Sequence, residues 1–253
     1  MQLAYSTWMD VEAYLKRSKG VIIPIGSTEQ HGPTGPIGTD AICAEVIARH
    51  LGDAVGGLVT PTISVGMSVH HTAFPGSLTL RPSTLMRVIE DYVMCLAGYG
   101  LERFFFVNGH GGNEASLAAA FWEMWAKAPL SALAGADRLR FMSISWWTPE
   151  PVAKLKHELF GDKDGGHATP AEISVAMFAC PDQNWITASL PQGVAPVVAG
   201  RRLGQGQAGF QRDWPDGRIQ SDPTLARPEH GKRLVEACVE SMSATYKAFM
   251  EAK

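Results

Sequence analysis

Cysteine is scarce in this sequence, and no two cysteines stand close together. The chain of 253 residues has four of them and no CxxC pair. This pattern argues against a disulfide framework and against a zinc site made of cysteines, so we expect buried free thiols at Cys43, Cys95, Cys180 and Cys238. A chain of this length can bury a large core without such cross-links, and we expect residues 1–253 to form a single domain.

Long apolar runs and a strong excess of one charge are also missing. No segment reaches roughly 18 consecutive apolar residues, and the N-terminus has no apolar stretch behind a basic start, as a secretory signal would have. The formal net charge is −3, with 45% apolar and 19% charged residues. This ordinary globular composition offers neither a basic face for nucleic acid nor a polybasic patch for a membrane. We therefore expect a cytoplasmic protein that binds neither.

Several common catalytic motifs are absent. The sequence has no P-loop, no GxSxG turn, no HExxH helix and no GxGxxG directly after a first strand. The glycine-rich segment "RRLGQGQAG" (201–209) lacks a preceding strand pattern. These absences argue against nucleotide binding, serine-hydrolase chemistry and a zincin protease.

Short apolar runs alternate with helical patterns along most of the chain. β-Branched or aromatic runs predict strands, and apolar residues at helical spacing predict helices. This alternation predicts an α/β fold, a three-layer α/β/α sandwich with a mostly parallel central sheet and a ligand site beyond the carboxyl ends of its strands. Residues 190–231, rich in Gly and Pro, predict a long surface excursion near that site. The expected strands span 20–26, 56–66, 104–107 and 139–147, and the expected helices span 39–53, 81–100, 113–128 and 232–253.

The segment "PIGSTEQHGPTGPIGTD" (24–40) follows the first expected strand and carries three candidate metal ligands. Glu29 and His31 are two residues apart, so an extended chain points both side chains the same way, toward one metal or toward two adjacent metals. Asp40 stands at the start of a helical pattern. It can serve as the helix N-cap, which Asp favours without any metal, and it can also bridge two metals.

Two further segments place polar side chains at the same predicted edge of the sheet. In "FFFVNGHGGN" (104–113), His110 directly follows a buried strand, and we expect the amides of Gly111, Gly112 and Asn113 at the next helix start to hold an anion or oxyanion. "DGGHATPAEIS" (164–174) ends in a helix start. It carries His167 in a glycine turn and Glu172, a first-turn glutamate that either compensates the helix dipole or binds a metal.

Together these residues offer two or three histidines and three carboxylates, a ligand mixture that suits Zn²⁺ or Mn²⁺. A bridging Asp is typical of two metals roughly 3.5 to 4 Å apart, and such a pair lowers the pKa of a bridging water and polarises a carbonyl oxygen, as amide hydrolysis requires. Roles stay open for the loop histidines His70 and His71. They also stay open for Trp146 and Trp147, which can cover a flat substrate or pack in the core.

In their order along the chain, "GSTEQHGPTGPIGTD", "FPGSLTL", "FFFVNGHGGN" and "GGHATPAEIS" resemble the motifs of the creatininase family of amidohydrolases. The resemblance covers nearly the whole chain. It implies the α/β/α fold, a binuclear centre of zinc or manganese with iron(II) as a further option, a small-molecule substrate and a homo-oligomer, commonly a hexamer. By motif it implies His167 as the catalytic proton shuttle, Asp40 as the bridging ligand, and the other metal ligands at Glu29, His31, His110 and Glu172.

Two positions depart from the family pattern. Creatinine-cleaving members have a glutamate two positions after the histidine of "NGH", where this chain has Gly112, and Thr34 stands where relatives often have histidine. "NGHGGN" is similar to relatives that cleave a peptide in mycofactocin maturation, a formamide or a cyclitol ring. We predict a metal-dependent hydrolase of a C–N bond in a cyclic amide, a formamide or another small amide. The alternatives are a metal-dependent lyase or isomerase acting on a sugar-like ring and a non-enzymatic metal-binding protein.

Overall fold

A parallel four-stranded sheet lies at the centre of the computed structural model, which describes residues 1–127, 138–183 and 206–252. The strand order is β2-β1-β3-β4, and all three pairings are parallel. The predicted α/β class with a mostly parallel sheet is confirmed. The strands are β1 (Gly20–Ile25), β2 (Leu58–Val59), β3 (Arg103–Asn108) and β4 (Arg140–Ser145).

Strand β1 is buried along its whole length, as expected of a strand covered on both faces. The second strand, β2, is much shorter than the predicted strand over 56–66. Pro61 has no N–H to donate to the ladder, so regular pairing stops before it. Beyond Pro61, the chain returns to β1 through Ile63, whose N–H donates to the carbonyl of Pro24 at 3.0 Å.

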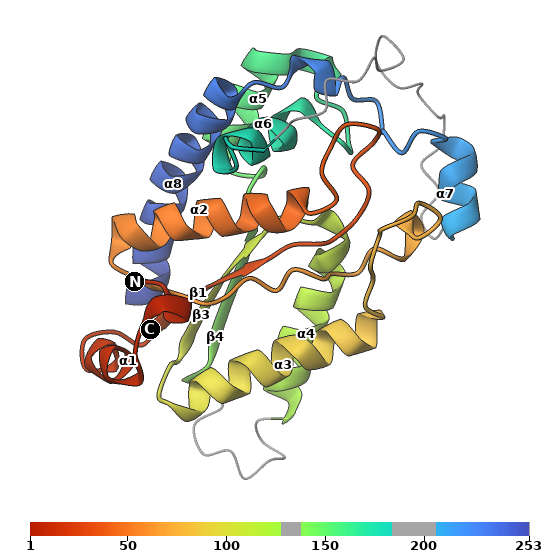
Figure 1. Ribbon diagram of the computed structural model, residues 1–253. Helices are drawn as coiled ribbons and strands as arrows, with labels where there is room; N and C mark the ends of the chain where they lie inside the picture. The colour runs from red at the N-terminus through yellow and green to blue at the C-terminus, as the bar shows by residue number, and fades with distance from the viewer. Residues whose placement is uncertain (128–137, 184–205, 253) are drawn as a thin grey trace.

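Helices cover both faces of the sheet and give the molecule three layers, as Figure 1 shows. The short helix α1 (Trp8–Leu15) lies near the amino ends of the strands, and α7 (Gln207–Asp213) lies beyond their carboxyl ends. One face carries α2 (Thr39–Val55), α5 (Glu150–Phe160), α6 (Pro170–Ala179) and α8 (Pro228–Glu251), and the other carries α3 (Pro82–Gly98) and α4 (Glu114–Lys127).

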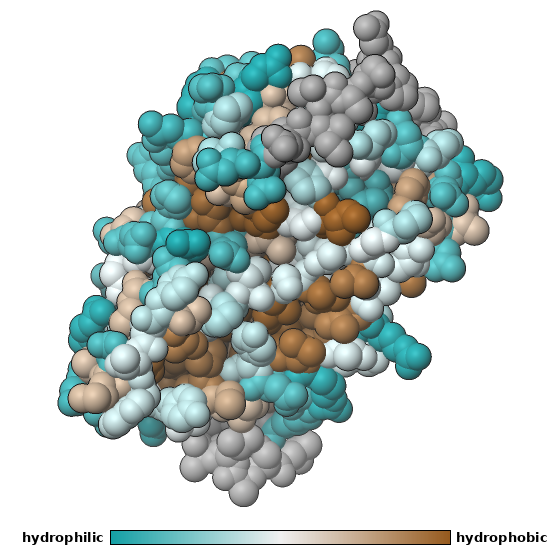
Figure 2. Space-filling view, in the orientation of Figure 1, coloured by the Kyte–Doolittle hydropathy of each residue, from teal (hydrophilic) through white to brown (hydrophobic). Residues whose placement is uncertain are grey.

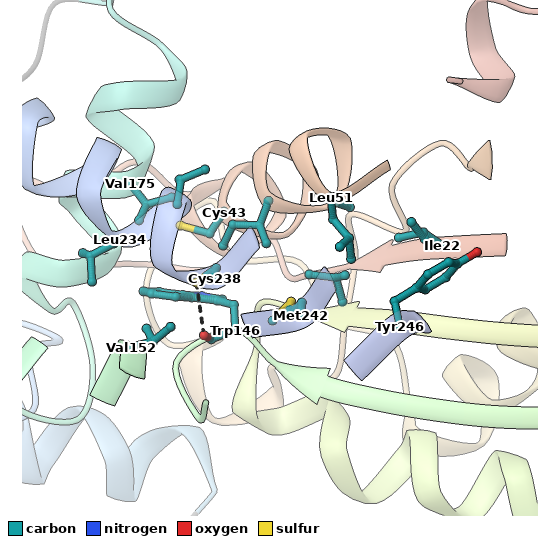
Figure 3. Packing of buried hydrophobic residues seen from close by; sticks show 14 of the residues in the cluster. Ile22, Cys43, Leu51, Trp146, Val152, Val175, Leu234, Cys238, Met242 and Tyr246 are labelled. Carbon is teal, nitrogen blue, oxygen red and sulfur yellow. Dashed lines mark hydrogen bonds between the residues drawn. The ribbon is translucent and has the colours of Figure 1, made fainter. Parts of the chain in front are cut away.

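The two faces bury separate apolar clusters, because successive strand residues point to opposite sides. Ile22 and Phe105 belong to the cluster under α2 and α8, whereas Ile23 and Phe106 belong to the cluster under α3 and α4. Figure 3 shows part of the first cluster around Trp146, whose carbonyl accepts a hydrogen bond from the Cys238 thiol. Trp146 therefore packs in this core, and it also borders the cavity at the carboxyl ends of the strands.

Some sequence predictions need correction. All four cysteines are free, but only Cys43 and Cys238 are buried. Cys95 is exposed on amphipathic helix α3, and Cys180, where α6 ends, is half-buried.

Figure 2 shows hydrophilic side chains over much of the surface and hydrophobic ones in the band between α2 and α3.

The C-terminal third also differs in detail from its prediction. The last helix begins at Pro228 rather than at residue 232, since proline is favoured in a first helical turn. Part of the predicted excursion over 190–231 lies outside the described residues, and the rest includes α7 and a 3-10 turn at Pro223–Leu225. No helix in the described ranges is long and apolar enough to cross a membrane.

Candidate metal centre

The candidate ligands meet beyond the carboxyl ends of β1 and β3, where the sequence pattern predicted a site. A cavity of about 470 Å³ opens there. His31 is completely buried beside it. The cavity wall includes Glu29, Asp40, His110, His167 and Glu172. Because His31 contacts both Asp40 and Glu172, all six predicted site residues are brought together.

Glu29 and His31 lie in the loop after β1, and their side chains reach different partners. The Nδ1 atom of His31 lies 3.0 Å from the carbonyl of Glu29 and must donate to it, because a carbonyl only accepts. His31 Nε2 then faces Asp40 Oδ1 at 3.0 Å and Glu172 Oε1 at 3.8 Å. Glu29 Oε2 instead lies 3.2 Å from His110 Nε2.

Asp40 lies between His31 and His110. Its Oδ1 faces the ring of His31, and its Oδ2 lies 3.1 Å from His110 Nδ1. Helix α2 has Gly38 as its N-cap residue and no side-chain cap, and Asp40 sits in the first turn. The helix-cap alternative for Asp40 is therefore wrong, because its carboxylate turns to the two imidazoles instead.

His110 is fixed by the loop that follows β3. Asn108 accepts a hydrogen bond from the His110 amide at 3.1 Å. The Met67 carbonyl lies 3.0 Å from His110 Nε2, so that nitrogen donates and Nδ1 is left to face Asp40. The Asn113 amide donates to the His110 carbonyl at 3.1 Å, so it is not available to an anion as predicted.

At Gly112 the backbone lies closer to the His110 ring and the Met67 carbonyl than a residue with a side chain would permit. A Cβ at this position would collide with the ring of His110 and the carbonyl of Met67. The backbone therefore has no room for a glutamate here. Gly111 and Gly112 both line the cavity, so this part of its wall is backbone.

Glu172 combines the two roles that its sequence position left open. The Thr169 hydroxyl accepts from the Glu172 amide at 3.1 Å, and Glu172 Oε1 accepts from the Thr169 amide, which forms a capping box at the start of α6. The carboxylate also borders the cavity and approaches His31. Capping uses only one of its two oxygens.

Within the described part of the chain, three overlapping groups of side chains have ligand atoms close enough to hold a metal ion. They are Glu29, Asp40 and His110; His31, Asp40 and Glu172; and Glu29, His31 and His167, each with ligand atoms within 4.8 Å of one another. The first two groups share Asp40. Their nitrogen and oxygen donors are those that Zn²⁺ and Mn²⁺ accept.

The donor atoms of the first two groups fit divalent cations. Glu29 Oε1 and Asp40 Oδ2 are buried and accept no hydrogen bond from the described residues, which is costly for a carboxylate unless a cation binds it. His31 and His110 each donate one ring N–H to a backbone carbonyl and keep the other nitrogen for the site. Metal-binding imidazoles are usually oriented in this way.

Burial and neighbouring charges shift the pKa values in the site. Burial raises the pKa of Glu29 and that of Glu172 to about 7. Burial acts to lower the pKa of His31, but the Asp40 and Glu172 carboxylates raise it to about 10. In the same way, Glu29 and Asp40 outweigh burial and raise the pKa of His110 to about 9. The raised pKa values mean that the metal-free site keeps protons on its carboxyl and imidazole groups, and bound cations would replace these protons.

His167 lies at the cavity wall next to these groups. Its Nε2 is 2.7 Å from the carbonyl of Gln30 and must donate to it, so Nδ1 keeps a lone pair. That Nδ1 lies 3.8 Å from Glu29 Oε1. Burial, reinforced by the positive charge of His31, lowers the pKa of His167 well below its usual value. The neutral ring can accept a proton on Nδ1.

Sequence reasoning left open or missed the roles of several residues that the fold brings to the site. His71, one of the two loop histidines left open, is buried with its Nε2 3.3 Å from Glu29 Oε1. Gln30 was not singled out, although a glutamine between two candidate ligands was a usable signal. The cavity lining also includes His70, Trp146, Trp147 and Lys156, of which Lys156 was marked by no motif.

Comparison with known proteins agrees with this geometry. The family model for creatininase, described as creatinine amidohydrolase, matches residues 4–246. A mycofactocin precursor peptide peptidase of Mycolicibacterium smegmatis is 29% identical over 85% of this chain and 78% of its own length. A creatinine amidohydrolase of Pseudomonas putida is 24% identical, with 94% and 92% of the two chains covered. A 3-dehydro-scyllo-inosose hydrolase of Thermotoga maritima is 24% identical over 97% of this chain and 82% of its own.

Solved structures show the same fold. A manganese form of creatininase superposes with a TM-score of 0.84 at 22% identity, over 99% of both chains. A zinc-zinc form of a creatininase variant gives a TM-score of 0.83 at 21% identity, over 99% of this chain and 98% of the other. Since the family model spans nearly all of the sequence, this chain belongs to the creatininase family.

Proposed function

We propose that this protein is a metal-dependent amidohydrolase that cleaves a C–N bond in a small molecule with two divalent ions. The position of Asp40 carries this proposal. Its two carboxylate oxygens face two different imidazoles, His31 and His110, at 3.0 and 3.1 Å. A carboxylate with a histidine on each oxygen is suited to bridge two metals.

The two metal groups follow from that bridge. Glu29, Asp40 and His110 would hold one ion, and His31, Asp40 and Glu172 the other. Zn²⁺ or Mn²⁺, alone or together, suits these donors, and Fe²⁺ is a further option. The similar creatininase structures include a zinc-zinc form and a manganese form. Such ions supply a Lewis acid for the substrate carbonyl and lower the pKa of a water molecule.

His167 is the proposed proton shuttle. Its Nε2–H is held by the Gln30 carbonyl, which leaves Nδ1 as the basic atom at the cavity wall. The ring can take a proton from a water molecule on Nδ1 and return it to the leaving nitrogen of the amide. The third metal group, which includes His167, would use this atom as a ligand instead.

The substrate we propose is a cyclic amide, a formamide or another small amide. A cavity of about 470 Å³ suits a small molecule. We do not propose creatinine, because Gly112 stands where creatinine-cleaving relatives have a glutamate, and the backbone has no room for a side chain there.

A peptidase of the mycofactocin-maturation type is a second candidate. The higher identity to the peptidase, 29% against 24% for the creatinine amidohydrolase, favours it. A cyclitol-ring hydrolase is a further alternative, similar to the Thermotoga maritima relative. A lyase or isomerase on a sugar-like ring differs from all of these, because only hydrolysis must place ¹⁸O from labelled water in the product.

The test couples metal analysis to an activity screen. The purified protein is assayed for metals and for hydrolysis of hydantoins, formamides, short peptides and creatinine, before and after exhaustive chelation. We expect about two metal ions per chain and an amidase activity that chelation removes and Zn²⁺ or Mn²⁺ restores. Full activity with no detectable metal contradicts the proposal, and bound metal with no activity on any amide favours the non-enzymatic alternative.

Three further features belong to the proposal. We place residues 1–253 in a single domain, because the apolar clusters lie on the two faces of one sheet. We propose assembly into a homohexamer on the family resemblance alone. We propose a cytoplasmic location on the sequence pattern alone.

A further inference from the structure

Gln30 lies between the candidate ligands Glu29 and His31, and two backbone groups hold its buried amide. Its Oε1 accepts from the Gly32 amide at 2.8 Å, and its Nε2 donates to the Gly217 carbonyl at 3.0 Å. A backbone N–H only donates and a carbonyl only accepts, so these contacts fix which end of the amide is which. Gly217 has a φ of +84°, and a Cβ there would collide with this amide.

The side-chain nitrogen of Gln30 carries two hydrogens. Three polar groups lie near it: the Gly217 carbonyl, His167 Nε2 and His71 Nδ1. One hydrogen goes to the Gly217 carbonyl. His167 Nε2 lies 3.0 Å away but already donates its own hydrogen to the Gln30 carbonyl, so it cannot accept. The second hydrogen therefore goes to His71 Nδ1, at 2.8 Å.

This assignment fixes the tautomer of His71. Since Nδ1 accepts, the neutral ring carries its hydrogen on Nε2. That nitrogen lies 3.3 Å from Glu29 Oε1, within ion-pair distance, and no other hydrogen donor among the described residues is aligned with this buried oxygen. A hydrogen donor, rather than a lone pair, therefore faces the carboxylate.

We propose that His71 is a positioning residue that does not bind metal, and that its Nε2–H, oriented by Gln30, holds the carboxylate of Glu29 toward His110. The role rests on the proposed function, in which Glu29 is a metal ligand. The rings of His71 and His167 stack with centroids 4.4 Å apart and approach the same oxygen of Glu29. One ring offers a hydrogen and the other a lone pair, so His71 can fix Glu29 while His167 stays free to accept a proton.

The tautomer can be read directly by NMR. Protein labelled with ¹⁵N-histidine is loaded with Zn²⁺, and long-range ¹H–¹⁵N correlation spectra separate protonated, unprotonated and metal-bound ring nitrogens. The signals of His71 are assigned by their loss in His71→Gln. We expect a protonated Nε2 and an unprotonated Nδ1 on His71. A protonated Nδ1, or a metal-bound Nε2, overturns the proposal.

Variants test the effect on metal binding. His71→Gln keeps a donor that can reach Glu29, His71→Phe keeps a flat ring without one, and Gln30→Glu replaces the amide donor with an acceptor. Removing an outer hydrogen bond to a metal ligand typically costs about 10- to 100-fold in metal affinity. We expect that loss for one of two zinc equivalents in His71→Phe and Gln30→Glu, measured by chelator competition, with affinity close to wild type in His71→Gln.

His157→Phe is the matched control, since His157 is exposed on α5. Circular dichroism establishes that each variant folds. Equal zinc affinities of His71→Phe and His71→Gln overturn the positioning role. If the wild-type protein binds no zinc, the proposed function fails separately, and the tautomer of His71 in the metal-free protein then decides this inference.

Discussion

Strands β1 and β3 begin in an apolar core and lead into loops whose buried side chains are charged or polar. Ile22 and Phe105 are enclosed by apolar side chains of the helices that cover the sheet. A few residues further along the same two segments, Glu29 and His110 are just as well buried but face other charged groups. Two carboxylate oxygens at this rim have no hydrogen-bond partner among the described residues.

The contrast separates the source of stability from the source of chemistry. Burial of the apolar clusters stabilises the fold by removing nonpolar area from water. Burial of carboxylates and imidazoles at the rim opposes folding unless cations or protons balance them. Substitutions at the rim should therefore change metal binding and activity, and substitutions in the clusters should change stability.

The strongest test of this contrast is Asp40→Ala. Because Asp40 contributes to both metal groups, we expect both ions to be lost and activity to fall below detection. The protein should still fold, since the apolar clusters are untouched. Metal analysis, an amidase assay and circular dichroism check this, with Asp53→Ala on the exposed side of α2 as control. Retention of both metals by Asp40→Ala argues against the bridge.

A substitution at His167 separates the two possible roles of its ring. As a proton shuttle, His167→Gln should lower kcat by about 10²- to 10⁴-fold while both metals stay bound. As a ligand of the third group, it should lose metal. The assay measures kcat and metal content in the same preparation, with the exposed His157→Gln as control.

The apolar side of the comparison is tested by Phe105→Ala. Phe105 is completely buried and lies edge-on to Tyr246 with ring centroids 5.4 Å apart. Its truncation should lower the free energy of unfolding by about 3–5 kcal/mol. Metal content per folded chain should not change. Chemical denaturation provides the measurement, and Trp122→Ala, at a position 70% exposed, should stay within about 0.5 kcal/mol of wild type.

A smaller effect should appear in the pH dependence of stability. The pKa values of Glu29, Glu172, His31 and His110 are all raised in the folded chain without metal. A raised pKa stabilises at pH values below the unfolded pKa, and this contribution is lost as the pH rises through the folded value. His71 and His167 have lowered pKa values and act in the opposite direction below about pH 7, so the metal-free protein should lose stability between about pH 7 and about pH 10.

Bound metals replace those protons, so the metal-loaded protein should not lose stability as the pH rises. The difference in Tm between metal-loaded and metal-free protein should widen from about pH 7 to about pH 9, as measured by calorimetry. A constant difference over this range means that the protons and the metals do not compete for the same groups.

Most of the fold and the principal candidate ligands could be predicted because their signals are local. The buried run of β1 is continuous in the sequence, and Glu29 and His31 follow it within six residues of its end. Glycines beside His110 and His167 marked two further turns. Each of these features can be seen within a window of about ten residues.

The supporting residues could not be predicted in the same way, because their roles depend on contacts between distant segments. The hydrogen bond between Gln30 and His71 joins residues 41 positions apart, and that between His167 and the Gln30 carbonyl spans 137. Lys156 reaches the cavity from α5, a helix without a motif. Local patterns also suggested a cap for Asp40, and only the fold shows that its oxygens face two histidines.

Anomalous diffraction from crystals of the metal-loaded protein tests the central claim most directly. Data collected at the zinc or manganese absorption edge locate the ions without reference to any assigned role. The account predicts two peaks, one on each side of the Asp40 carboxylate, the first also in contact with Glu29 and His110 and the second with His31 and Glu172. An active protein with a single peak, or with no peak next to Asp40, would contradict it.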